Sequence, residues 1–181
     1  MNHPLHQHLQ EAYGLSQEGC RLFQSLVEEE PVAKGAFLLT AGKVCRTVYF
    51  IQQGSIRRFF LHEGKEINTH FHFEQNFVTD LKSLRDGKPS GLFMQALEDT
   101  TLLKFSGEDL QQLYQRFPEI ESMGRRLLES LLLQQEEKSV LFQRYSPEER
   151  YQYLLQYQPK LLQRVSLTHI ASYLGISRES L

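Results

Sequence analysis

The sequence predicts an α+β protein in which a closed β-sandwich or jelly roll is followed by a long helix and then by a helix-turn-helix. Three observations carry this prediction. Short segments rich in Val, Ile, Phe and Thr, separated by glycines, run from Pro31 to Phe105. Apolar residues at heptad spacing follow, and the last helical stretch is broken by a glycine. We therefore expect three parts, at residues 1–118, 119–143 and 144–181.

Composition excludes several classes of protein. The chain has 181 residues, of which 40% are hydrophobic and 23% charged, as in ordinary globular domains. No run approaches the roughly 18 apolar residues of a membrane span, and the first ten residues lack the pattern of a secretory signal. We expect a cytoplasmic protein with no membrane partner. Cys20 and Cys45 are too few for a disulfide framework or an all-cysteine iron–sulfur cluster, and we interpret both as small core residues.

Charge is distributed unevenly along the chain. The formal net charge is −2, yet residues 144–181 carry five Lys or Arg against three Asp or Glu. A positive C-terminal part on a slightly acidic chain is the pattern expected when only that part contacts nucleic acid.

The N-terminal part begins with a short helix and continues as strands. Ser16 can cap a helix whose apolar residues recur at intervals of three and four. Strand-like runs follow at 48–51 and 56–61, and then, after the polar turn HEGKE, an alternating run at 67–73. Many short strands at this spacing predict the sandwich or jelly roll.

Helical patterns return at Ser106, which can cap a helix that ends before Pro118. The longer helix that follows carries apolar residues at coiled-coil spacing, which predicts a homodimer contact. A helix that lies only on its own sheet remains an alternative. The expected interface residues are Ile120, Met123, Leu127 and Leu131.

The C-terminal residues predict a helix-turn-helix. Ser146 and Pro147 can start one helix, and Ser166 can cap another. Small Ala171 allows a second helix to approach closely, and Gly175 permits the backbone conformation of the turn.

Two segments resemble the Crp/Fnr family of bacterial transcription regulators, and the similarity extends over essentially the whole chain. KGAFLLTAGKVCRTVYFIQQGSIRRFF resembles the opening strands of the family's roll, and LTHIASYLGISRESL resembles its helix-turn-helix. The resemblance implies a cyclic nucleotide-binding-type β-roll, a dimerisation helix and a winged helix-turn-helix. It also implies a DNA-binding regulator rather than an enzyme, with promoter DNA, a second copy and RNA polymerase as expected partners.

The effector pocket departs from the pattern of the members that bind cyclic nucleotides. Where those members have glycine, glutamate, arginine and serine, this chain has Thr79, Asp80, Ser90 and Gly91. Without the arginine, a cyclic phosphate loses a charge-assisted partner. We therefore expect no cofactor and no binding of cyclic AMP. A pocket filled by its own side chains and a ligand-sensing module for another small molecule both remain open.

A metalloenzyme is the rival from a different class. The spacing from Gly64 to His70 and His72 matches the start of the cupin metal motif, but Glu74 follows too soon. The only later histidine, His169, lies in the helix-turn-helix. We therefore expect no metal site and no catalytic residues, and we expect His62, His70 and His72 to face solvent.

The second helix of the C-terminal motif is the expected reader of DNA bases. Its first residues are Ser177, Arg178, Glu179 and Ser180, of which Arg178 can contact guanine and Glu179 cytosine. Ser166 and Thr168, at a helix N-terminus, suit phosphates, as does Ser177. The sequence ends one turn into this helix, so we expect the motif to be incomplete for tight binding.

Overall fold

A computed structural model describes residues 4–178. Two four-stranded antiparallel sheets form the β-roll predicted from the sequence. One sheet has the order β1-β8-β3-β6 and the other β2-β7-β4-β5. Their bounds are β1 Glu28–Val32, β2 Phe37–Leu39, β3 Thr47–Gln53, β4 Ile56–His62, β5 Lys65–His72, β6 Phe77–Val78, β7 Phe93–Ala96 and β8 Thr100–Ser106.

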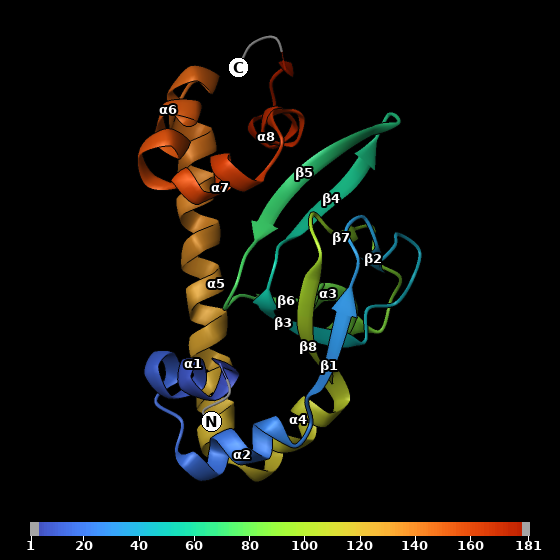
Figure 1. Cartoon of the computed structure of the whole chain (residues 1–181), viewed down its shortest axis with the longest axis vertical. Coiled ribbons are helices and arrows are strands. Elements are labelled where there is room, and N and C mark those ends of the chain that lie inside the picture. The colour runs from blue at the N-terminus through green and yellow to red at the C-terminus, as the bar shows by residue number, and fades with distance from the viewer. Residues whose placement is uncertain (1–3, 179–181) are drawn as a thin grey trace.

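One long helix organises the rest of the molecule. In Figure 1, α5 runs along the long axis of the molecule. Helices α1, α2 and α4 lie at one end of α5, and α6 to α8 lie at the other end, beside the β4–β5 hairpin. The helices are α1 Pro4–Tyr13, α2 Gln17–Gln24, α3 Leu81–Asp86, α4 Gly107–Arg116, α5 Pro118–Arg144, α6 Pro147–Tyr157, α7 Pro159–Arg164 and α8 Leu167–Leu174. Among the described residues, no helix is long and apolar enough to cross a membrane.

Serine caps fix the starts of four helices, and the sequence predicted each of them. The side chains of Ser16, Ser106, Ser146 and Ser166 each accept a backbone N–H of the first turn of the following helix. Ser146 also forms a capping box with Glu149. The structure adds α1, α3 and α7, which the sequence analysis did not identify.

Two glycines are required by geometry. Gly54 has φ +100° in the turn between β3 and β4, and a Cβ there would lie 2.8 Å from Thr100 Cα. Gly175 ends α8 in the left-handed conformation, as the helix-turn-helix prediction requires.

The core has separate parts. One cluster joins the first helices, the roll and the start of α5, and includes Ile120 and Met123. A second fills the roll itself. A third joins α6, α7 and α8, with Phe71 and Phe73 of the roll packed against it. The C-terminal helices therefore have their own small core and also rest on the β5 side of the roll.

Candidate functional site

The segment from Phe77 to Gly91, called here the cassette segment, is where the family's cyclic nucleotide contacts would lie. Asp80 caps α3, since its Oδ1 accepts the N–H groups of Lys82 and Ser83 at 3.2 and 3.3 Å. The Ser90 hydroxyl donates to Asp80 Oδ2 at 2.6 Å. The structure thus brings two of the predicted residues together, as partners of each other.

The other two predicted residues of the cassette segment do not form a phosphate site with them. The Thr79 hydroxyl donates to the Thr47 carbonyl oxygen at 2.9 Å, inside the roll. Gly91 is exposed, and a Cβ added there would meet nothing within 4 Å. Ser90, in the position of the family's arginine, is buried. No cation therefore stands at the matching position.

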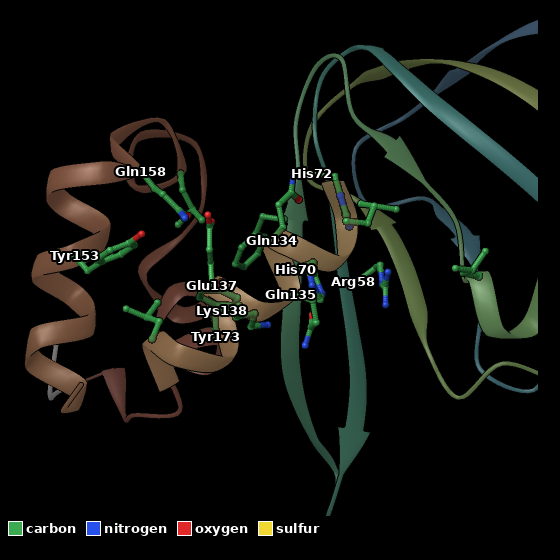
Figure 2. Close-up of a pocket in the computed structure, with 15 residues that line it drawn as sticks. Arg58, His70, His72, Gln134, Gln135, Glu137, Lys138, Tyr153, Gln158 and Tyr173 are labelled. Atoms are coloured by element: carbon green, nitrogen blue, oxygen red, sulfur yellow. The ribbon is translucent and has the colours of Figure 1, made fainter. Parts of the chain in front are cut away.

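Cationic side chains gather instead in a neighbouring cavity of about 370 Å³ between the roll, α5 and the C-terminal helices. Figure 2 shows Arg58, His70 and His72 on the roll facing α5, which carries Gln135 and Lys138. We call this space the cation cavity. Its lining is Arg58, His70, Phe71, His72, Leu81, Leu131, Gln134, Gln135, Glu137, Lys138, Leu141, Tyr153, Gln158, Leu161 and Tyr173.

Burial lowers the pKa values of the two cations of this cavity, Arg58 and Lys138. Desolvation lowers the pKa of Arg58, an effect that the charge of Asp80 opposes. Desolvation and the nearby Arg58 charge lower the pKa of Lys138 to about 8. Lys138 Nζ donates to the Thr69 carbonyl oxygen and lies 4.7 Å from the centroid of the Tyr173 ring.

The prediction that His70 and His72 face solvent was wrong. His72 is 9% exposed, and both rings line the cation cavity, with centroids 5.8 Å apart. Burial, reinforced by Arg58 and Lys138, lowers the pKa of each histidine to about 3, so both are neutral at pH 7. The cause is long-range, because α5 covers the face of β5 that local alternation assigned to water. His62 is exposed, as expected.

A bulge in the β4–β5 hairpin explains how Lys138 reaches the sheet. Arg58 pairs with His70, and the next residue of β4, Phe59, pairs with Asn68. Thr69 is therefore left out of the pairing register, and its carbonyl group is the one that Lys138 contacts. Arg58 and Lys138 are functional candidates that the sequence analysis missed. The only sequence signal was a pair of consecutive arginines in a strand, where alternation places one side chain on each face.

The other arginine of this pair joins the roll to α8. Arg57 forms an ion pair with Glu66 at 2.5 Å and lies 3.2 Å from Nδ1 of His169 in α8. The Ser172 hydroxyl, also in α8, donates to the Glu66 carbonyl oxygen and accepts the Asn68 N–H, at 2.6 and 3.0 Å. These contacts of the β4–β5 hairpin hold α8 against the roll.

A second polar contact holds α7. The guanidinium of Arg164 donates to both oxygens of Glu74 at 2.6 and 2.8 Å, and to Glu98 at 2.5 Å. It also lies over the Phe73 ring, 5.0 Å from the centroid. Hydrogen bonding from Arg164 lowers the pKa of Glu74 to about 2. The roll and the C-terminal helices are therefore joined by charged as well as apolar contacts.

The predicted DNA-contacting residues lie at the two ends of α8 and beyond. Ser166 caps α8, and Thr168 is exposed in its first turn. Ser177 and Arg178 are exposed after the Gly175 turn. Glu179 and Ser180 lie outside the residues that the structure describes. Of the predicted DNA contacts, Thr168, Ser177 and Arg178 are thus exposed to solvent within the described residues.

The apolar residues predicted as a dimer contact divide into two sets. Ile120 and Met123 are buried in the chain's own core, and Leu127 packs against it. Leu131 lines the cation cavity and is partly exposed. The apolar side chains that α5 leaves most exposed are Leu128, Leu132 and Leu133, together with Val140.

Among residues 4–178, no group of three or more His, Cys, Asp or Glu side chains could hold a metal ion. Cys20 and Cys45 are buried and free, in line with the core role predicted for them.

Comparisons with known proteins agree with this architecture. Residues 29–117 match the family model described as cyclic nucleotide-binding domain. The chain is 30% identical over 131 residues to the fumarate and nitrate reduction regulatory protein of Vibrio cholerae, a match that covers 72% of this chain and 52% of that protein. The chain spans little more than half the length of the relatives that it matches.

Two solved structures share the fold. FixK2 from Bradyrhizobium japonicum has a TM-score of 0.72 at 20% identity, covering 85% of this chain and 80% of that one. The catabolite activator protein of Thermus thermophilus has a TM-score of 0.62 at 24% identity, covering 96% and 82%. A roll of this type, a long helix and C-terminal helices occur here in one order, and the chain is similar to regulators of the Crp/Fnr family.

Proposed function

We propose that this chain is a dimeric DNA-binding transcription regulator that acts on promoter DNA in the cytoplasm, alongside RNA polymerase, and is not an enzyme. The observation that carries the proposal is that Ser177 and Arg178, the first residues of the predicted recognition helix, are exposed after α8 in a chain with a roll and a long helix of the family's type. The regulatory names of its relatives support it.

Arg178 is the residue with which to test DNA reading. A two-fold dimer presents two identical readers, so it matches a pseudo-palindromic site whose half-sites lie about one helical turn apart. Selection from random duplex DNA with the full-length protein should enrich such a site. Arg178→Ala should weaken binding by about 1–3 kcal/mol and relax preference at one base pair per half-site.

Arg164→Lys, which keeps the charge of a residue that contacts the roll, serves as the control and should leave the selected sequence unchanged. Enrichment of one asymmetric motif, or of none, would contradict the proposal. A uniform loss across all sequences in Arg178→Ala, with a smaller salt dependence, would assign Arg178 to phosphate contact instead of base reading.

We propose that the second copy packs on the exposed leucines of α5. Leu132 is 69% exposed and Leu128, one turn earlier, 47% exposed. Burying a leucine contributes about 1.5–3 kcal/mol, so one charge in this stripe is costly. Leu132→Asp should turn the dimer into a monomer in sedimentation at micromolar concentration. Leu61→Asp, at a leucine of the β4–β5 hairpin that is 53% exposed, should remain a dimer. A wild-type monomer would exclude the dimer.

The roll is proposed to have no site for cyclic AMP, since Asp80 and Ser90 are bonded to each other and Ser90 stands where the members that bind cyclic nucleotides have arginine. Calorimetric titration of the chain with cyclic AMP should give no heat of binding at micromolar concentrations. Micromolar binding that is lost in Ser90→Ala would show that this segment holds a phosphate by another route. A sensor for a different small molecule is the second candidate, and the cation cavity favours it.

A further inference from the structure

The cation cavity holds two positive side chains without a paired acid among residues 4–178. Arg58 Nη1 donates to the Thr79 carbonyl oxygen at 3.4 Å, and its buried Nε has no hydrogen-bond partner. Lys138 Nζ donates to a carbonyl oxygen and faces an aromatic ring. Because a buried charge without a counter-charge is costly, these cations favour the entry of an anion.

The acids near the cavity do not fill this role. Asp80 is the carboxylate whose charge acts on Arg58, but it accepts the Ser90 hydroxyl and two backbone N–H groups. Glu137 is exposed at the cavity and forms no ion pair with Lys138 among the described residues. No acid among the described residues therefore forms an ion pair with Arg58 or Lys138.

Histidines supply further hydrogen-bonding groups. Nε2 of the buried His72 and Nδ1 of His70 have no hydrogen-bond partner in the described part of the chain. Neutral imidazole offers one donor and one acceptor, so neither ring needs a charge to contact a ligand. Gln134 and Gln135 line the same space with amide groups.

The rest of the lining suits an apolar body. Phe71, Tyr153 and Tyr173 contribute rings, and leucines from α3, α5 and α7 complete the wall. A volume of about 370 Å³ lies within the range of small-molecule sites, which are mostly apolar with a few convergent polar groups.

We propose that the cation cavity binds a small organic anion, with Arg58 and Lys138 at its anionic group and the aromatic wall against its apolar body. The anionic group lies on the β4, β5 and α5 side of the roll and not in the cassette segment. The role of this ligand as an effector rests on the proposed function, whereas its binding does not.

A pair of dyes tests the proposal. Anilinonaphthalene sulfonate carries an aromatic body and one negative charge, and N-phenylnaphthylamine is its uncharged counterpart. Fluorescence titration of the full chain, without DNA, gives a Kd for each dye. Arg58→Gln and Lys138→Gln should each weaken binding of the sulfonate more than threefold and change binding of the neutral dye less than threefold.

Two controls separate the cavity from the surface and from folding. Arg125→Gln, on an exposed part of α5, should bind both dyes as the wild type does. Lys138→Arg keeps the positive charge and should bind the sulfonate with the affinity of the wild type. A loss of less than threefold in both glutamine variants, or an equal loss of both dyes, would overturn the proposal. The proposal would also be overturned if Arg125→Gln weakened sulfonate binding as much as Arg58→Gln and Lys138→Gln do.

These outcomes are independent of DNA binding. A chain that selects a DNA site but whose glutamine variants keep the sulfonate would reject the anion site alone. A chain that binds the sulfonate through Arg58 and Lys138 but selects no DNA would reject the proposed function alone.

Discussion

In the cassette segment the buried polar side chains have hydrogen-bond partners within the fold, whereas in the adjoining cation cavity several buried polar atoms have none among residues 4–178. Asp80 is bonded to Ser90, and the Ser83 hydroxyl donates to the Lys88 carbonyl oxygen and accepts the Cys45 N–H. Across the roll, Arg58 Nε and His72 Nε2 lack partners. Satisfied groups stabilise a loop and leave nothing for a ligand, while unsatisfied ones cost stability and retain the capacity to bind. The cassette segment therefore has a structural role, and the cation cavity is the region suited to bind a ligand.

We expect the largest loss of stability from a substitution in the cassette segment. Asp80→Ala removes the cap of α3 and takes away the acceptor of the buried Ser90 O–H, whose oxygen still accepts the Leu92 N–H. A lost cap costs about 0.5–2 kcal/mol and a stranded buried group about 1–3 kcal/mol, so we expect a loss of about 2–4 kcal/mol in the free energy of unfolding. Urea denaturation measures it. Asp86→Ala, at an exposed aspartate of the same helix, is the control, and an equal effect there would contradict this account.

We expect an intermediate effect on stability from the ionisation of His72 in the cation cavity. The pKa of His72 is about 3 in the folded chain and 6.5 in the unfolded one, so as pH falls below 6.5 only the unfolded chain takes up the proton. Stability is therefore full above pH 6.5 and decreases towards pH 3. His70 behaves alike, and Arg58 and Lys138 both oppose a charge on His72.

Replacing His72 with Phe should make the loss of stability between pH 7.5 and 5 smaller by about 1–2 kcal/mol. Denaturation at the two pH values measures this difference. The exposed His62 offers the matched variant, since His62→Phe should keep the pH dependence of the wild type. An unchanged dependence in His72→Phe would mean that His72 ionises freely in the folded protein.

We expect the smallest change in stability from a substitution of Lys138 in the cation cavity. Lys138→Met removes a desolvated cation and one hydrogen bond while it keeps the contact with Tyr173. The two consequences oppose each other, so we expect a change within about 1 kcal/mol in the free energy of unfolding at pH 7. Exposed Lys82→Met should be near neutral. A loss from Lys138→Met as large as that from Asp80→Ala would show that Lys138 has a strong partner within the fold.

Local patterns in the sequence were enough to predict the roll, the long helix and four caps. Each depends on residues within one turn or one strand, as Ser16 and Ser106 illustrate. The cavity was not predictable in this way. Which of Arg57 and Arg58 faces inward, and how Lys138 meets Thr69, depend on a bulge and on contacts between distant elements. Ile120 and Met123 were predicted on the correct helix, but packing against α1, α2 and the roll removes them from its exposed face.

Ser172 has a consequence for self-association. β5 is the edge strand of its sheet, and an edge offers free N–H and C=O groups to strands of other copies. Lys65 and Glu66 place charges at the tip of the hairpin, but residues 68–71 carry no acidic or basic charge at pH 7. Here the Ser172 hydroxyl occupies one N–H and one C=O of β5, as a neighbouring strand would. Whenever α8 leaves the hairpin, both groups are uncovered, and β5 becomes open to pairing with the β5 of another molecule.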